Sequence, residues 1–425
     1  MEDILAFIWK NGLLKRDRLQ CCDGRAVRVI SPGTETPCGS GLFADAAIEL
    51  DGVAVKGCVE VMPSCRNGGG NGFILRVAEA GGDMRKWSSP VPTLLLDLGQ
   101  ETRVVARGLR SRTEEPPCVE AMPGLSPLFT ADLFTSLALE RLQNKSLRVL
   151  KWLEAYNGDW EETCYVSVAR SLGFGINGDP FEETARSLPL AFLRKHADSP
   201  FQTEAMLFGC AGLLGRADGA CDGYTARLCN EFDFLSRKFT LAPIGGKDKW
   251  RFGGMRPSNF PHQRIAFLAK LITSYNGIFA RITDARNAEE IRKIFTLYLD
   301  DYWDTHYTFG HETPPVKKSL GRGGCDIILI NSVAPLLYAY SCRSGRDTFA
   351  ERAISLVEGC RPEKNHITRR FSACGLPCDN ALASQAMIEL QNSYCARRRC
   401  LECRIGAHIV RRVAGENIRT VCFNG

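Results

Sequence analysis

The sequence predicts an α+β protein, with a small β-rich N-terminal domain followed by a larger all-α helical domain. Two observations predict this class. Short apolar or alternating segments between turn residues fill residues 25–107, and helical periodicity dominates from residue 128 onward. The 425 residues suffice for two or three domains, and a hydrophobic content of 44% is that of an ordinary folded protein.

The β-rich domain is expected at residues 1–112, with a leading amphipathic helix in residues 1–20. Asp51-Gly52 is a hairpin turn signal within this domain. The expected strand segments are 26–30, 46–61, 72–82, 92–98 and 102–109. Residues 113–127 contain four prolines and are expected to form a linker.

The helical domain is expected at residues 128–425, with about ten helices and a C-terminal cysteine cluster. Thr130, Asp159 and Asp179-Pro180 have the properties of helix starts. The apolar run from Asp326 to Tyr340 is too short and too interrupted to cross a bilayer, so no membrane partner is expected. The expected helical windows are 130–156, 161–172, 180–195, 200–214, 222–237, 261–275, 287–303, 325–341, 346–359, 380–394 and 400–413.

The positive charge is concentrated near the C-terminus. The net charge is +6, and residues 361–425 alone carry eleven basic and five acidic residues, which gives the same +6. Such a basic segment favours polyanions, and DNA or RNA is the expected partner. The alternative is a solvated Arg-rich helix face without a partner. Two acids precede the first apolar stretch, which is not a secretory pattern, so a cytoplasmic location is expected.

Five separated strings resemble a bacterial family known as domain of unknown function 2851, which is common in Bacteroidetes-type bacteria. The resemblance covers nearly the whole chain, includes the N-terminal string IWKNGLL, and implies no established activity. The strings are DWEETCYVSVARSLGFGINGDPFE (159–182), SPFQTEAMLFGCAGLL (199–214), RPSNFPHQRIA (256–266), YWDTHYTFG (302–310) and YCARRRCLECRIG (394–406).

The resemblance also implies a degenerate nuclease-like site in the β-rich domain. Members of the family carry a Gly-Pro-Asp-Phe string and a later Val-Glu-Ile-His string, in a spacing similar to that of restriction-type nucleases. Here the Asp position falls at Leu42, the Glu remains as Glu60 and the His position is Met62. The later polar positions fall in residues 64–72. One carboxylate is too few for a catalytic divalent metal, and Asp45 is expected on the opposite strand face. The nuclease-like site is therefore expected to be lost, and a non-enzymatic β scaffold is favoured.

Nineteen cysteines are expected to be reduced thiols, and most are expected to be structural. Cys164 and Cys210 lie in apolar helical patterns, whereas Cys118 has no ligand spacing around it. The spacing Cys395-x4-Cys400-x2-Cys403 predicts three metal ligands, of an iron–sulfur cluster in preference to zinc because all three donors are sulfur. The alternative is three reduced cysteines on a short helix. The candidates for a fourth ligand are Cys374, Cys378, His408 and Cys422.

Arginines surround the predicted metal site and are the candidate nucleic-acid ligands, because cations beside the thiols favour thiolates and place a basic face next to phosphates. They are Arg397, Arg398, Arg399, Arg404, Arg411 and Arg412.

Two further motifs lie in the helical domain. His306 with nearby Asp304 is a candidate general base, and its alternative is a hydrogen-bonded structural histidine among aromatics. Gly321-Arg322-Gly323-Gly324 precedes a helix and could bind phosphate, or could be a plain helix entry. Arg264 follows a basic turn that begins at Arg256.

Three hypotheses follow. The leading one is a cytoplasmic nucleic-acid-associated protein with a basic, metal-stapled C-terminus. The second is a non-catalytic scaffold with a structural zinc. The third is an enzyme with a helical-domain pocket around His306, whose small-molecule ligand the sequence does not identify.

Overall fold

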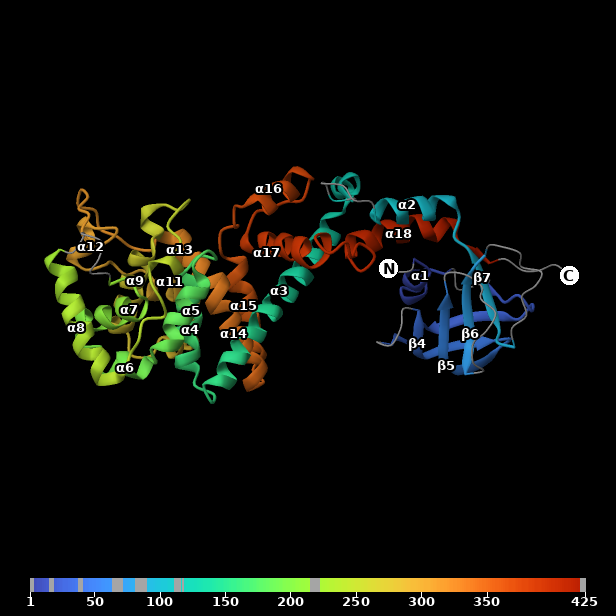
Figure 1. The fold of residues 1–425 in the computed structure, drawn as a ribbon. Coiled ribbons are helices and arrows are strands. Elements are labelled where there is room, and N and C mark those ends of the chain that lie inside the picture. The colour runs from blue at the N-terminus through green and yellow to red at the C-terminus, as the bar shows by residue number, and fades with distance from the viewer. Residues whose placement is uncertain are drawn as a thin grey trace. The chain divides into compact units, whose positions relative to one another are not determined.

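The computed structural model describes residues 4–14, 19–36, 41–62, 72–80, 90–110, 116, 118–214 and 222–420 (Figure 1). The chain forms two compact units. The first comprises Met1–Leu133, His366–Pro377 and Met387–Gly425, and the second comprises Phe134–Asn365 and Cys378–Ala386. The predicted α+β class is confirmed, since strands dominate the N-terminal part and helices the larger remainder.

The division differs from the predicted boundary at residues 113–127. Residues expected to be a linker include a 3₁₀ turn, Val119–Gly124, that belongs to the first unit. The C-terminal segment also belongs to this unit, because its helix packs against a helix that follows the sheet and its last strand pairs with the sheet.

A single mixed sheet forms the centre of the first unit. Its strands are β1 (Leu19–Gln20), β2 (Ala26–Ser31), β3 (Thr34–Glu35), β4 (Leu42–Leu50), β5 (Val53–Met62), β6 (Phe73–Glu79), β7 (Thr93–Asp97) and β8 (Arg419–Thr420). The strand order is β1-β2-β4-β5-β6-β7-β8, and β3 pairs with β4. The pairs β5–β6 and β6–β7 are parallel, and the others are antiparallel.

The hairpin between β4 and β5 fixes the register of the sheet. Its turn is the predicted Asp51-Gly52, and both residues have positive φ, of 47° and 83°, as a two-residue hairpin turn requires. At the other end of the hairpin, Leu42 is the direct partner of Glu60. Between these ends the register shifts in β4, where Asp45 is exposed with φ of 56°, so strict strand alternation does not place its side chain.

Three helices accompany the sheet: α1 (Ile4–Lys10), α2 (Gln100–Arg110) and α18 (Arg404–Asn417). The predicted strand at 102–109 is wrong, because this segment forms α2. Thr102, Val105 and Leu109 lie on its inner face at helical spacing, whereas Val104 is 59% exposed. The helix packs against α18, and this tertiary contact overrides the β preference of two adjacent valines (Figure 1).

The second unit is helical. Its elements are most of α3 (Pro127–Ala155), α4 (Trp160–Leu172), α5 (Gly178–Ser187), α6 (Leu190–Arg194), α7 (Pro200–Cys210), α8 (Gly223–Phe239), α9 (Pro261–Ser274), α10 (Ile278–Asp284), α11 (Ala288–Ile294), α12 (Asp301–Thr305), α13 (Gly321–Ile328), a π turn (Leu329–Val333), α14 (Ala334–Ser344), α15 (Asp347–Glu358) and part of α17 (Ala381–Glu389). Asp159 caps α4 as predicted, by accepting hydrogen bonds from the N–H groups of Glu161 and Glu162. Thr130 lies inside α3, which begins earlier than predicted.

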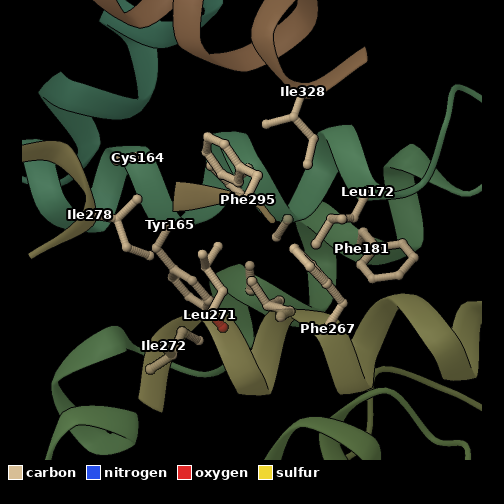
Figure 2. Packing of buried hydrophobic residues seen from close by; sticks show 14 of the residues in the cluster. Cys164, Tyr165, Leu172, Phe181, Phe267, Leu271, Ile272, Ile278, Phe295 and Ile328 are labelled. Carbon is tan, nitrogen blue, oxygen red and sulfur yellow. The ribbon is translucent and has the colours of Figure 1, made fainter. Parts of the chain in front are cut away.

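The core of the helical unit is apolar and well filled. Tyr165 from α4, Phe181 from α5, Phe267 from α9 and Ile328 from α13 converge there, each at most 1% exposed (Figure 2). Cys164 is also fully buried in this core, as is Cys210, so both match the structural role predicted for them. Burial on this scale anchors α13 and α9 firmly, which matters for the side chains that these helices carry.

A continuous helical run, Gly321–Ser344, comprises α13, the π turn and α14. It is longer than the apolar segment seen in the sequence, and it is long and apolar enough by length and composition to cross a bilayer. Of its most apolar window, 72% is buried inside the protein. Packing within the helical core therefore accounts for its apolar character.

Candidate metal centre

Four cysteine thiols gather in the first unit. Cys118 immediately precedes the 3₁₀ turn Val119–Gly124, and Cys395 ends a π turn, Leu390–Cys395. Cys400 lies in the following turn, and Cys403 is the N-cap residue of α18. Cys118 and Cys400 pack against the same apolar cluster as Leu401 of that turn. The fold thus brings one cysteine from the N-terminal part of the chain to the three predicted from their spacing.

The thiols are close enough to one another to interact electrostatically in every pairing. Burial raises the pKa of Cys118, and Cys403, Cys395 and Cys400 raise it further. Burial also raises the pKa of Cys395 to about 12, with added contributions from Cys403 and Cys400. The pKa of Cys403 is raised by burial and by Cys400. Buried neighbouring thiols that disfavour one another's ionisation are a group that a cation would convert to thiolates.

Backbone and side-chain groups favour the thiolate form at two of these positions. The N–H groups of Gly406 and Ile405, at the start of α18, lower the pKa of Cys403. Arg370 and Arg398 lower the pKa of Cys395. These contributions oppose the larger effect of burial, so the site combines low solvent access with local positive potential.

Gly406 shows how tightly the cysteine turn packs on α18. A Cβ atom added at this residue would lie 2.0 Å from the carbonyl oxygen of Cys400. No side chain other than hydrogen fits there without moving the turn. The path of the backbone between Cys400 and Cys403 therefore depends on this glycine.

Among the residues that the structure describes, no group of three or more His, Cys, Asp or Glu side chains is already arranged as a set of metal ligands. The four thiols lie near one another but are not arranged around a common point as metal ligands are. Their donor set is uniformly sulfur, which suits zinc or an iron–sulfur cluster and not magnesium or calcium.

Three of the four fourth-ligand candidates lie in described residues. Cys374 is buried on the segment that follows α16 (His366–Ala373), and Cys378 belongs to the helical unit. The ring of His408 contacts that of Phe129 at 4.6 Å. Cys422 lies outside the described residues. Cys118 was missed because a single cysteine in a Pro-rich stretch has no local ligand spacing, and only the fold brings it near the others.

Several candidate nucleic-acid ligands are engaged within the protein. Arg399 forms an ion pair with Glu402 and lies over the ring of Tyr394, and Arg404 forms an ion pair with Asp132. Arg411 donates a hydrogen bond to Asn11, and Arg398 also has a partner.

The remaining two, Arg397 and Arg412, are exposed and make no hydrogen bond or ion pair with any described residue. These two arginines are therefore the ones available to an external anion.

The strand pair with a nuclease-like pattern holds a completed ion pair. Glu60 on β5 lies opposite Leu42 on one side and Arg76 on the other. The Nε of Arg76 donates to a carboxylate oxygen of Glu60 at 2.7 Å, and the Arg76 side chain is 3% exposed. The single carboxylate is thus used to neutralise a buried guanidinium, while Leu42 supplies no ligand. Residues 64–71 lie outside the described residues.

His306 and Asp304 do not face each other. The Nδ1 of His306 lies 3.0 Å from the carbonyl oxygen of Tyr302, and its Nε2 lies 3.9 Å from Asp222. Asp304 instead pairs with Lys317 at 2.6 Å. His306 also stacks on the ring of Tyr302 at 4.0 Å, which is the geometry of the structural alternative.

A pocket in the helical unit is lined by residues of α3, the π turn, α15 and α17, among them the polar Arg141, Lys145 and Gln385, and His306 is not part of this lining.

A buried carboxyl group that the sequence did not single out lies next to Trp303, three residues before His306 in the chain. Glu204 on α7 is 4% exposed and accepts hydrogen bonds from the hydroxyl of Tyr224 at 2.6 Å and the indole N–H of Trp303 at 3.1 Å. Burial raises its pKa to about 7. Only its position in an apolar window, SPFQTEAMLFGC, could have indicated it.

These features define a class of protein: a mixed-sheet unit completed by the C-terminal segment, together with a helical unit. The chain belongs to a family described as proteins of unknown function, DUF2851, whose model matches residues 2–67 and 71–366. The predicted family is thereby confirmed, and the string at 394–406, with three of the four cysteines, lies beyond the match. No curated protein and no solved structure matches the chain.

Proposed function

We propose that this chain is a nucleic-acid-associated protein whose C-terminal segment is fixed to its sheet unit by a metal bound to Cys118, Cys395, Cys400 and Cys403. The observation that carries the proposal is that these four cysteines, drawn from distant parts of the sequence, lie in one unit near enough to raise one another's pKa, beside a basic segment. Such a site would be compatible with a reducing cytoplasm, where free thiols persist.

The donor set favours an iron–sulfur cluster, with zinc as the alternative. Four cysteine thiolates are the usual ligands of both, and no histidine or carboxylate is needed to complete the set. In either case the bound cation would supply the charge that makes buried thiolates favourable. Its role here is structural, because it would tie the turn before α18 to the segment that holds Cys118.

The basic surface supports nucleic acid as the partner. Arg397 and Arg412 are exposed and are not neutralised by any described residue. The surplus of six positive charges in residues 361–425 adds a long-range attraction to phosphates. The proposal assigns no cleavage to the β4–β5 strand pair, since Leu42 supplies no carboxylate there and Glu60 is paired with Arg76.

One observation favours a second candidate, a scaffold protein with a structural zinc. Arg399 and Arg404 form ion pairs within the protein, with Glu402 and Asp132. An arginine whose charge is already balanced by a carboxylate attracts phosphate less strongly, so these two pairs favour a protein without a nucleic-acid partner.

The first experiment is anaerobic purification with metal analysis and a visible spectrum, on wild type, Cys118→Ser and Cys342→Ser. Cys342 is an exposed free cysteine in the helical unit and is the matched control. We expect metal in wild type and in the control and its loss in Cys118→Ser. Iron with sulfide identifies a cluster, and zinc identifies a structural zinc site; zinc together with no binding of DNA or RNA favours the scaffold. A metal-free wild type contradicts the proposal.

The second experiment measures DNA and RNA binding as a function of salt concentration. Removal of both Arg397 and Arg412 by substitution with Gln is expected to reduce the slope of log K against log salt by about 2, because each lost phosphate contact removes about one counterion. The control replaces the exposed Arg237 and Arg346 of the helical unit by Gln, which removes the same charge. Equal effects of the two double variants, or no binding by wild type, contradict the nucleic-acid role.

A further inference from the structure

A buried guanidinium in the helical unit has no acidic partner. Arg264 on α9 is 4% exposed. Its Nη2 donates to the side-chain oxygen of Asn259 at 2.5 Å, and its Nε is buried without a hydrogen-bond partner. Within the described part of the chain no carboxylate forms an ion pair with it, and burial lowers its pKa to about 10. A buried cation left in this state is costly unless an anion joins it.

The guanidinium is held in one orientation. Its carbon lies 4.4 Å from the centre of the Phe174 ring, in the loop that follows α4. Stacking on an aromatic face is a favourable position for an arginine, and it leaves the edge of the guanidinium free to donate hydrogen bonds. Phe174 thus positions Arg264 and does not neutralise it.

The start of α13 meets the same aromatic ring. A Cβ atom added at Gly324 would lie 3.7 Å from the Phe174 ring, and the thiol of Cys325 interacts electrostatically with Arg264. The helix begins at Gly321, and its N-cap residue, Leu320, provides no side-chain hydrogen bond to the free N–H groups. The Phe174 ring is therefore a common neighbour of the buried guanidinium and of the uncapped start of α13.

The helix start is open to a ligand. Gly321, Arg322 and Gly323 are exposed, and Cβ atoms added at the two glycines would meet nothing within 4 Å. Arg322 adds a third source of positive potential and forms no ion pair with a described residue. The acid of α13, Asp326, is already bound to Arg292 at 3.0 Å. Nothing acidic on this helix therefore competes for an anion at its start.

We propose that Arg264, Arg322 and the glycine-rich start of α13 form a binding site for the terminal phosphate of a small phosphorylated molecule. Backbone N–H groups at a helix start and an arginine are the groups that bind phosphate in proteins. The depth of Arg264 selects a terminal phosphate, because a diester carries substituents on two sides and cannot bring its oxygens to a side chain that is 4% exposed. This site lies in the helical unit and does not depend on the cysteine cluster.

Calorimetric titration of the full-length protein with inorganic phosphate, a sugar phosphate monoester and a dialkyl phosphate diester tests the proposal. We expect the first two to bind and to raise the melting temperature, and the diester not to bind. Tighter binding of the monoester than of inorganic phosphate identifies an organic ligand, and the reverse order identifies free phosphate. Failure of both to bind wild type overturns the proposal, as does equal binding of the diester.

Two variants locate the site. Arg264→Gln removes the buried cation and is expected to weaken binding of the monoester at least about tenfold, the scale of a hydrogen bond between charged groups. Gly323→Asp places a negative charge in the first turn of α13, where it favours the helix but repels phosphate. It therefore remains a valid test if Arg264→Gln fails to fold.

The matched control is Gly223→Asp, which makes the same change in the first turn of α8, at a glycine with equally open space. We expect it to bind phosphate like wild type. If Gly323→Asp binds as wild type does, or if Gly223→Asp loses as much affinity, the start of α13 is not the site.

Discussion

Arg76 in the sheet unit and Arg264 in the helical unit are buried to the same extent, at 3% and 4% exposure, but differ in their partners. Arg76 contacts the carboxylate of Glu60 at 2.7 Å, whereas Arg264 has an amide oxygen and an aromatic ring. A carboxylate partner neutralises the charge of a buried cation. A buried cation without a carboxylate partner can still bind an external anion. The sheet site therefore has the character of a structural element, and the helical site that of a receptor.

The largest expected effect comes from breaking the completed pair. Glu60→Ala leaves Arg76 buried without its carboxylate and is expected to lower the free energy of unfolding by about 3 kcal/mol. Urea denaturation measures the change. The double variant Glu60→Leu with Arg76→Leu is the control and should recover most of the loss, since an apolar pair leaves no uncompensated charge. A loss below about 1 kcal/mol in Glu60→Ala would show that solvent replaces the carboxylate.

Glu204 extends the comparison to a buried acid that forms no ion pair with a described residue. Burial raises the pKa of Glu204 to about 7, so its folded state holds a proton that the unfolded state releases above pH 4.5. Its contribution to stability is present below pH 4.5 and is lost as the pH rises to about 7, by about 3 kcal/mol. Glu204→Gln should remove this decline, which denaturation curves from pH 4 to 8 can follow.

The difference between wild type and Glu204→Gln is the quantity to compare. Burial lowers the pKa of His262 to about 3. Its contribution to the free energy of unfolding therefore changes with pH in the opposite direction, because it is lost as the pH falls below 6.5. Subtracting the stability of Glu204→Gln from that of wild type cancels the contribution of His262, which is present in both proteins. A difference that does not change with pH would mean that Glu204 titrates near its ordinary value.

The smallest expected effect is at the unpaired cation itself. Arg264→Met, measured in buffer free of phosphate, should change the free energy of unfolding by less than about 1 kcal/mol, because no ion pair is broken and a buried charge is removed. Added phosphate should then stabilise wild type and leave the variant unaffected. If Arg264→Met costs as much as Glu60→Ala, Arg264 has a partner within the protein and the contrast between the two arginines fails.

Local patterns in the sequence predicted elements whose causes are local. The Asp51-Gly52 turn and the Asp159 cap formed as predicted, because each depends on a few neighbouring residues. The segment around Val104 was predicted as a strand and forms α2 instead, since its conformation depends on contact with α18. That contact joins residues far apart in the sequence, and no local pattern contains it.

The candidate sites show the same limit. Spacing alone predicted Cys395, Cys400 and Cys403 as ligands, because thiols a few residues apart leave a local pattern. Cys118 approaches them only through the fold. Likewise Arg264 and Gly321-Arg322-Gly323-Gly324 were each visible in the sequence, but the common proximity of Arg264 and Gly324 to Phe174 was not. The ion pair that occupies Glu60 also depends on strand register, which the sequence did not specify.

The discontinuous composition of the sheet unit has a consequence for synthesis on the ribosome. The helical unit ends at Ala386, so all of its residues have been made before α18 and β8 exist. Until then, β7 lacks its pairing with β8 and α2 lacks its packing against α18. The strands of the sheet unit are therefore translated well before β8 and α18 complete the unit, and an unpaired sheet edge is a feature that chaperones commonly bind in nascent proteins.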